Sequence, residues 1–421
     1  MKAIWSKIPQ SALVLFDQLI VSGSNFLLAI AVTQALGLEA FGRYSLWWMV
    51  VLFALSLSQA LITKPLLSLA PRQTEADYPR GVFQLQVVFG TALGCLLLVL
   101  LRLAIQLGYW EGDWATTLIV SLLAVLHPLY DFCRKYHFLR SDFWLPLLLD
   151  ATYAILLFGS LGLQYFWGQL SVAVFLQTLL VIHLLVLLVG IGRTNLWRTW
   201  EAQRWRACWR QHFDYAKWLV GTALLQWWSG NYFLLAAAAL LGPVALGAIR
   251  MVQNLMGLLH VLFLAMENLI PLRAAQQYER EGLPALKKYL AAITRKLGGL
   301  TALLLALIAI FAEPLLGFLY GTEQSSYHEV VLGCCLIYVF VFLTHPLRYA
   351  LRTLGDTRPI FWAYVWGSGF SLLTAYPLVR TWSLYGVLLG LLCTQVAALL
   401  VYLFFLWKRK FFYESYSLGT R

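Results

Sequence analysis

The sequence contains little charge and no polar stretch long enough to form a soluble domain. Charged residues make up 12% of the 421 residues and hydrophobic residues 61%, and the mean hydropathy is +0.73. This composition excludes an ordinary soluble globular protein. It predicts a polytopic membrane protein with an all-α fold.

The sequence also lacks the motifs of soluble enzymes and of metal sites. It has no P-loop, no HExxH, no GxSxG and no glycine-rich dinucleotide turn. Its six cysteines form no CxxC pair and lie mostly in apolar segments, so they predict neither a disulfide framework nor a metal site. We therefore expect no enzymatic activity, no catalytic residues, no bound metal and no cofactor.

Long apolar runs are abundant, and each membrane span needs about 20 apolar residues. The runs predict twelve transmembrane helices in two groups of six, separated by a basic, tryptophan-rich linker over 193–215. We expect an N-terminal lobe over 1–192, a C-terminal lobe over 216–407 and a tail over 408–421. The predicted spans are 11–36, 44–69, 81–108, 115–133, 144–165, 170–192, 216–241, 247–270, 292–318, 327–350, 359–379 and 384–407.

Basic residues are distributed unequally between the two sides of these spans. Of 31 lysines and arginines, all but Arg43, Arg102, Arg250 and Arg380 fall on one side. The positive-inside rule then predicts that both termini lie in the cytoplasm. The asymmetry accounts for the net charge of +12 without a nucleic-acid partner. The apolar run after Gln10 is too long for a signal peptide and predicts an uncleaved first helix.

Two short motifs occur once in each half of the chain. The segment Gly37–Gly42 (GLEAFG) returns as Gly242–Gly247 (GPVALG), and we expect a turn at each place. The segment His127–Arg134 (HPLYDFCR) returns as His345–Arg352 (HPLRYALR). Because each half has an even number of predicted spans, the halves are expected to be parallel repeats with a central site between them.

Polar residues follow one side of several predicted spans. At 100° per residue, Asp17, Gln18, Ser22 and Asn25 lie within an arc of about 140°. Single serine, threonine and glutamine residues more often join helices than bind a substrate. Charges inside a membrane are costly and usually functional, so Asp17, Arg250 and Glu267 are functional candidates. The polar faces predict an aqueous cavity.

The chain resembles the polysaccharide-transporter family, the lipid-linked oligosaccharide (O-antigen type) flippases of the multidrug/oligosaccharidyl-lipid/polysaccharide (MOP) exporter superfamily. The resemblance covers the whole chain and depends on the order of its features: the first helix, the duplicated twelve-span plan, GLEAFGRY over 37–44, FAEPLLGFLYG over 311–321 and LRTLGDTR over 351–358. It implies a two-lobed transporter of the bacterial inner membrane that works by alternating access. Such a protein moves glycans on polyprenyl pyrophosphate to the outer leaflet for surface polysaccharide biosynthesis, including lipopolysaccharide.

The resemblance also implies roles for individual residues and partners. Phosphate needs cations and sugars need amide and hydroxyl partners, so we expect a substrate cavity and assign it eight residues. The acidic candidates Asp17 and Glu267 would couple transport to H⁺ or Na⁺, and Arg134 and Arg352 are either a gate or part of the architecture. Expected partners are the lipid-linked oligosaccharide, membrane lipid and polysaccharide-assembly proteins. The cavity residues are Asn25, Arg43, Gln59, Lys64, Gln226, Arg250, Gln253 and Asn254.

Two other functions remain open from the sequence. An ion-coupled multidrug exporter of the same superfamily is favoured if the acidic residues act without a phosphate site. A membrane glycosyltransferase or ligase is disfavoured, because such enzymes commonly need a sizeable extracytoplasmic loop and the predicted outer loops are short.

Overall fold

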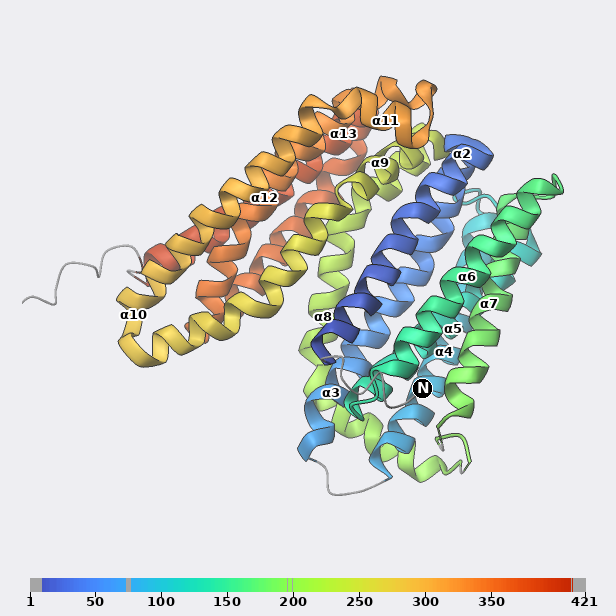
Figure 1. Cartoon of the computed structure of the whole chain (residues 1–421), viewed down its shortest axis with the longest axis horizontal. Helices are drawn as coiled ribbons and strands as arrows, with labels where there is room; N and C mark the ends of the chain where they lie inside the picture. Colours follow the sequence, from blue (N-terminus) through green and yellow to red (C-terminus); the bar gives the residue numbers. More distant parts are fainter. Residues whose placement is uncertain (1–9, 73–76, 195, 199, 410, 412–421) are drawn as a thin grey trace, which may run out of the picture. The chain divides into compact units, whose positions relative to one another are not determined.

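The computed structural model describes residues 10–72, 77–194, 196–198, 200–409 and 411 (Figure 1). All regular elements in these residues are helices. The chain divides into two compact units, Met1–Trp227 and Trp228–Arg421, and the boundary falls inside one helix, α8.

Unit 1 is organised around α5. This helix packs against α2, α4 and α7, and it carries the HPLYDFCR motif. A π-helix follows α2, and in it Gln59 contacts α5 and the Leu61 carbonyl contacts α8. The elements are α2 (Gln10–Ser58), the π-helix (Gln59–Thr63), α3 (Lys64–Leu69), a 3₁₀ turn (Ala70–Arg72), α4 (Tyr78–Gln106), α5 (Trp114–Leu139), α6 (Trp144–Phe166), α7 (Val172–Gly192) and the first part of α8 (Ala202–Leu241).

Unit 2 is organised around α12 in the same way. This helix packs against α9, α10 and α13, and it carries the second copy of the motif, HPLRYALR. The repeated motif therefore lies on the central helix of each unit. The remaining elements are α9 (Pro243–Leu255), α10 (Gly257–Ile310), α11 (Ala312–Tyr320), a 3₁₀ helix (Thr322–Tyr327), α12 (His328–Thr353) and α13 (Arg358–Lys408).

The repeated glycine motif encodes the same backbone break in both units. Gly37 interrupts α2 with φ 84° and ψ 170°, and Gly242 separates α8 from α9 with φ 88° and ψ 176°. An L-residue with a Cβ rarely adopts such a positive φ, so glycine is needed at these two positions. The predicted turn over 37–42 was too wide, because the helix resumes directly after Gly37.

Three helices are long enough to cross a membrane twice. The candidate spans Ala12–Leu69, Gly257–Ile310 and Arg358–Lys408 contain 58, 54 and 51 residues. Each contains one non-helical residue, namely Gly37, Gly282 or Ser383. At 1.5 Å per residue, about 20 residues suffice for one crossing. Figure 1 shows the two arms of α10 meeting at a bend.

The number of crossings is only partly established. Eight helices of the described chain are long and apolar enough to span a membrane. The α8 helix is not among them, because the stretch QWWSGNY over 226–232 lowers its hydropathy. The predicted ranges fall on helical segments, some with a one-residue interruption. The count of twelve, the two parallel repeats, the lobe boundaries and the cytoplasmic termini stay predictions.

The second half of the predicted linker is helical. The α8 helix already begins at Ala202. Ion pairs connect its first turn to the residues before α4 and before α8. The Nη2 atom of Arg204 lies 3.1 Å from Asp77 Oδ2, and its Nε lies 2.7 Å from Glu201 Oε2. The overlap of tryptophans and arginines on this segment hid the helix from pattern analysis.

His212 of α8 contacts the π-helix. Pro65 has no N–H, so the carbonyl of Leu61, four residues earlier, has no α-helical donor. The Nδ1 of His212 lies 3.1 Å from this carbonyl oxygen, and the Tyr78 hydroxyl lies 2.8 Å from His212 Nε2. A neutral ring satisfies both contacts, because Nδ1–H donates to Leu61 and Nε2 accepts from Tyr78. His212 is 0% exposed, and burial lowers its pKa to about 4.

We predict that acid destabilises unit 1 through His212. Its folded pKa of about 4 lies below the ordinary value of 6.5, so the unfolded chain binds the extra proton between these values. The stabilisation is complete above pH 6.5 and falls by about 2 kcal/mol by pH 5. Thermal unfolding in detergent at pH 7 and pH 5 measures the loss. His212→Gln should lose less stability than the wild type, and equal losses would contradict the assignment.

Candidate functional site

A buried cluster of charge joins three helices of unit 1, and we call Asp17, Asp131, Arg134 and Asp150 the aspartate–arginine cluster. Arg134 of α5 donates from Nη2 to Asp17 Oδ2 of α2 over 2.7 Å. Its Nε lies 2.7 Å from Asp150 Oδ2 of α6. The neighbouring Asp131 accepts a hydrogen bond of 3.2 Å from Gln59 Nε2. Asp17, Asp131 and Asp150 are all buried.

This cluster contains more negative than positive charge. Two carboxylates contact Arg134 and a third, Asp131, lies one turn before it on α5, and a buried ion in a low-dielectric interior is stable only with compensating partners. Asp17 is 3% exposed, and its second oxygen, Oδ1, has no hydrogen-bond partner among the described residues. A buried acceptor without a donor is a place where a proton or a cation is stabilised.

A pair of histidines lies beside this cluster. The Tyr130 hydroxyl donates to Asp150 Oδ1, and the Tyr130 ring packs against His183 with centroids 6.2 Å apart. His183 Nδ1 lies 2.7 Å from the carbonyl oxygen of Leu179, and its Nε2 lies 2.9 Å from His127 Nδ1. A neutral His183 that donates from Nδ1 to this carbonyl can accept at Nε2 from His127 Nδ1.

A second charged cluster lies in unit 2, and we call Glu267, His345, Arg348 and Arg352 the glutamate–arginine cluster. Arg348 Nη2 donates to Glu267 Oε2 over 2.7 Å, and Arg352 Nη1 donates to Glu267 Oε1. His345 Nδ1 lies 3.1 Å from the Tyr349 hydroxyl and 3.7 Å from Glu267 Oε2. The cluster joins α10 to α12.

The two clusters use the repeated arginine but have opposite charge balance. Arg134 and Arg352 occupy the same position in the repeated motif, and each binds a carboxylate from another helix. In unit 1 one arginine pairs with two carboxylates and a third, Asp131, binds Gln59 nearby, whereas in unit 2 two arginines share Glu267. The motif therefore conserves a helix-joining ion pair, while its neighbours make unit 1 acidic and unit 2 basic at this level.

Arg250 has only neutral partners, and we call Asn231, Arg250 and Gln253 the arginine–amide group. Its Nη1 donates to Gln253 Oε1 and its Nη2 to Asn231 Oδ1, both over 3.1 Å. No carboxylate forms an ion pair with Arg250 within the described chain. One helical turn later, Asn254 Nδ2 donates to the Tyr320 hydroxyl over 2.8 Å. Within the described residues, Arg250 therefore has no acidic ion-pair partner.

The other predicted cavity residues lie apart from these clusters. Asn25, Lys64 and Gln226 are exposed on α2, α3 and α8. Arg43 pairs with Glu39 one turn earlier on the same helix, with 51% and 56% of their side chains exposed. The structure thus brings together Asp17 with Arg134, Glu267 with Arg352, and Arg250 with Gln253. The role of each residue stays a prediction.

Sequence analysis gave no role to several residues of these clusters. Asp131 lies inside the repeated HPLYDFCR motif, where its charge next to Arg134 was a usable signal. Arg348 lies in the second copy but looked like one more cytoplasmic cation. Helical periodicity puts Asn231 on the opposite face of α8 from Gln226 and Thr222. Its contact with Arg250 depends on how α9 packs on α8, which periodicity within one helix does not show.

Comparison with known families and structures agrees with this fold. Residues 219–377 match the family model MatE. This segment is less than half of the chain, and it covers much of unit 2. No curated protein matches the sequence.

Solved structures match nearly the whole chain at low identity. One is described as the inward-facing conformation of a multidrug resistance MATE family transporter of the MOP superfamily, with a TM-score of 0.73, 13% identity and coverage of 97% of this chain and 100% of that chain. Another is the lipid II flippase MurJ in an inward closed conformation, with a TM-score of 0.66, 11% identity and coverage of 96% and 89%. The chain therefore has the fold shared by these proteins.

We predict that Arg134 is essential for the stability of unit 1. Arg134→Ala leaves Asp17 and Asp150 buried without a cation, which costs about 3–5 kcal/mol. The apparent unfolding temperature in detergent should fall clearly. Arg140→Ala removes the same charge from an exposed position at the end of α5 and should change stability by less than about 0.5 kcal/mol. Equal stability of the Arg134 variant and the wild type would contradict the role.

Proposed function

We propose that the protein is a membrane transporter that flips a polyprenyl-pyrophosphate-linked oligosaccharide from the cytoplasmic to the outer leaflet. The support for transport is the helical fold, the MatE match over 219–377 and the likeness to transporters along nearly the whole chain. The likeness to MurJ, described as a lipid II flippase, supports a lipid-linked substrate. We propose that the protein lies in the bacterial inner membrane and serves surface polysaccharide assembly.

The observation that carries this proposal is the unbalanced charge of Arg250. Arg250 donates to two neutral amide oxygens, and these leave its other N–H donors unused and its positive charge unneutralised. Binding of an anion would therefore stabilise this guanidinium. Arginine binds phosphate oxygens through paired N–H donors. A pyrophosphate headgroup therefore fits the arginine–amide group better than a cationic drug does.

Neighbouring side chains suit a sugar. Trp228 lies one turn before Asn231 on α8, and its indole Nε1–H is buried without an acceptor among the described residues. Its ring stacks on Tyr232 with centroids 4.8 Å apart. Amides and an indole donor match sugar hydroxyls, and aromatic rings match the apolar face of a sugar. We propose that the first sugars lie here, beside the phosphate.

In this mechanism the aspartate–arginine cluster couples an ion to transport. A proton or Na⁺ on Asp17 would compete with Arg134 for the carboxylate and weaken the contact between α2 and α5. Binding and release then bias two packings of the helices in unit 1, as alternating access requires. In unit 2, Arg352 pairs with Glu267 of α10, and we propose the two repeated arginines, Arg134 and Arg352, as the gate.

An ion-coupled multidrug exporter is the second candidate function. The observation that favours it is the acidic excess of unit 1, because buried carboxylates bind cations and protons. Proteins described as multidrug resistance MATE transporters share the fold. In that case Asp17 would act as proposed, while Arg250 would have a structural role.

Lipid analysis of cells that lack the protein tests the flippase function. We expect accumulation of polyprenyl-pyrophosphate oligosaccharide and loss of surface polysaccharide, because the substrate no longer reaches the outer leaflet. A plasmid carrying the wild-type chain should restore the surface glycan, and Arg250→Gln should restore less than about a tenth of it, since a lost ionic contact costs about 1.5–3 kcal/mol.

Arg380→Gln is the matched control for this experiment. Arg380 is an exposed arginine of unit 2 whose Nη1 donates to Tyr376 of the same helix, so its loss should leave the glycan unchanged. Full restoration by Arg250→Gln would remove that residue from the site. Normal surface glycan in the deletion strain, with new sensitivity to cationic drugs, would favour the multidrug exporter.

We predict that Asp17→Asn removes the dependence of transport on pH or Na⁺. The amide keeps the shape of the side chain but has no negative charge with which to bind a proton or a cation. Transport by the variant should therefore be flat across a pH series and a Na⁺ series in which the wild type responds. Asp214→Asn changes an exposed aspartate of unit 1 and should retain the wild-type profile. An unaltered profile in the Asp17 variant would reject ion coupling at this residue.

A further inference from the structure

Two arginines of α12 hold the same carboxylate in unit 2. Arg348 Nη2 donates to one oxygen of Glu267 over 2.7 Å, and Arg352 Nη1 donates to the other oxygen. Among the described residues, Glu267 is the only carboxylate within ion-pair distance of either arginine. Both guanidinium groups therefore converge on one place, and the group that occupies this place is an oxyanion.

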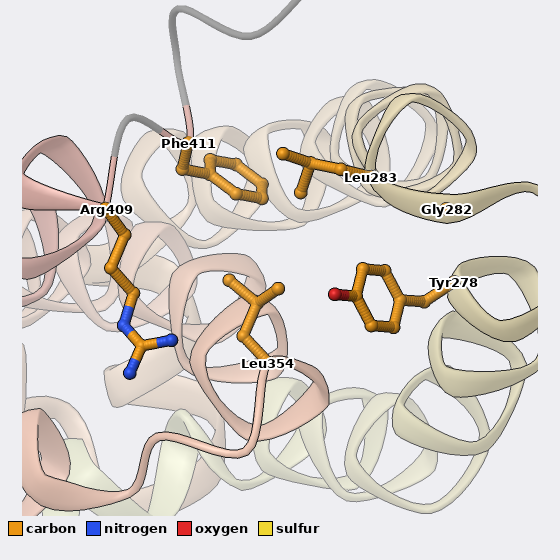
Figure 2. A pocket seen from close by; sticks show the side chains of 6 residues that line it. All are labelled: Tyr278, Gly282, Leu283, Leu354, Arg409 and Phe411. Atoms are coloured by element: carbon orange, nitrogen blue, oxygen red, sulfur yellow. The ribbon is translucent and has the colours of Figure 1, made fainter.

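The charge at this place is not balanced. One carboxylate neutralises one arginine, so Glu267, Arg348 and Arg352 together carry a net positive charge. Another arginine of unit 2 shows the balanced case: Arg409 lines a cavity of about 540 Å³ at the bend of α10 (Figure 2), and its Nη2 lies 2.7 Å from Asp356 Oδ2. Each charge of that pair has its own partner, whereas balancing two arginines at one place requires a dianion.

Arg348 also has a donor that Glu267 does not use. Its Nε is buried and has no hydrogen-bond partner among the described residues. Its Nη2 lies 3.0 Å from His345 Nδ1, and the ring of His345 packs on Phe263 with centroids 4.9 Å apart. The imidazole thus holds the guanidinium in position while one N–H lacks an acceptor. A buried donor without an acceptor is costly, and a ligand with one more oxygen than a carboxylate can remove this cost.

A ligand can reach this place from the surface. The exposed fraction is 39% for the Arg352 side chain and 28% for the Glu267 side chain, against 18% for Arg348. Glu267 belongs to α10 and both arginines belong to α12. Because a glutamate side chain has several rotatable bonds, the carboxylate can turn away while both guanidinium groups stay in position.

We propose that Glu267 is the replaceable occupant of a phosphate site formed by Arg348 and Arg352. A phosphate monoester carries about two negative charges above neutral pH and has three acceptor oxygens. It can therefore balance both arginines and accept from the unused Nε. The ligand class is a phosphate dianion, either free in solution or on a lipid headgroup. Without it, Glu267 fills the site and joins α10 to α12. The proposal does not rest on the proposed transport function, which depends on Arg250.

Phosphate binding to the purified full chain in detergent tests this site. The parent chain carries Arg250→Gln, so binding at the arginine–amide group does not contribute and the two hypotheses can fail separately. Titration calorimetry with inorganic phosphate, at about pH 8 where phosphate is a dianion and at constant ionic strength, gives the affinity. We expect Glu267→Gln to bind phosphate about tenfold more tightly than the parent, because the competing carboxylate is gone.

Three matched variants separate the site from general charge effects. Arg352→Gln should weaken phosphate binding about tenfold, since it removes a charge-assisted hydrogen bond. Glu279→Gln removes a negative charge from an exposed position of α10 and should leave the affinity unchanged. If Glu267→Gln fails to fold, Glu267→Gln/Arg348→Gln removes one charge of each sign and should bind phosphate no more tightly than the parent.

Thermal unfolding distinguishes a ligand site from a purely structural ion pair. We expect Glu267→Gln to unfold at a lower temperature than the parent and phosphate to restore the difference, whereas a structural pair would not respond to phosphate. Phosphatidic acid in micelles carries the same phosphate on a lipid. Tighter binding of this lipid than of inorganic phosphate, lost in Arg352→Gln, identifies a headgroup site, and equal affinity identifies a site for soluble phosphate.

Two results would overturn the proposal. One is phosphate binding by Glu267→Gln that is equal to or weaker than binding by the parent. The other is unchanged phosphate binding by Arg352→Gln.

Discussion

Pairing of arginine with carboxylates from other helices is the constraint that both units share, and in unit 1 the pair is buried. In an apolar interior a single arginine or aspartate is very costly, and the cost is reduced only when the partner comes within hydrogen-bond distance. Arg134 on α5 therefore fixes where α2 and α6 lie. In unit 2 the less exposed Arg348 and the exposed Arg352 of α12 both pair with Glu267 of α10. Helix-to-helix apolar packing alone would leave the axial position of these helices less well defined.

Both units contain an arginine–carboxylate pair at the repeated motif, but the charged residues around the pair differ between the units. The acidic excess around Arg134 makes unit 1 suited to a proton or a cation, while the shared Glu267 and the neutral partners of Arg250 make unit 2 suited to an anion. A transporter that couples an ion to an anionic lipid-linked substrate needs both kinds of site. The charge balance thus gives a physical basis for the proposed function and for its multidrug alternative.

Single residues with non-helical backbone angles interrupt the long helices at defined points. Gly37 and Gly242 adopt nearly the same positive φ, and Gly282, also at positive φ, lines a cavity at the bend of α10. The π-helix and Pro65 after it have a comparable effect: Pro65 lacks the N–H that would bind the Leu61 carbonyl, which contacts His212 instead, and Gln59 of the π-helix contacts Asp131. At the π-helix, an interruption of the regular hydrogen-bond ladder therefore coincides with polar contacts to neighbouring helices.

The sequence by itself determined the class of membrane protein, most of the helical ranges, the breaks at Gly37 and Gly242 and the repeated arginines, because apolar length and motif repetition are local properties. It also identified Asp17, Arg250 and Glu267, since an intramembrane charge is conspicuous in any apolar run. Only the tertiary structure decided which groups meet: Asp150 with Arg134, Arg348 with Glu267, and Asn231 with Arg250. These contacts depend on the rotation and axial shift of one helix against another, and no pattern within a single helix contains that information.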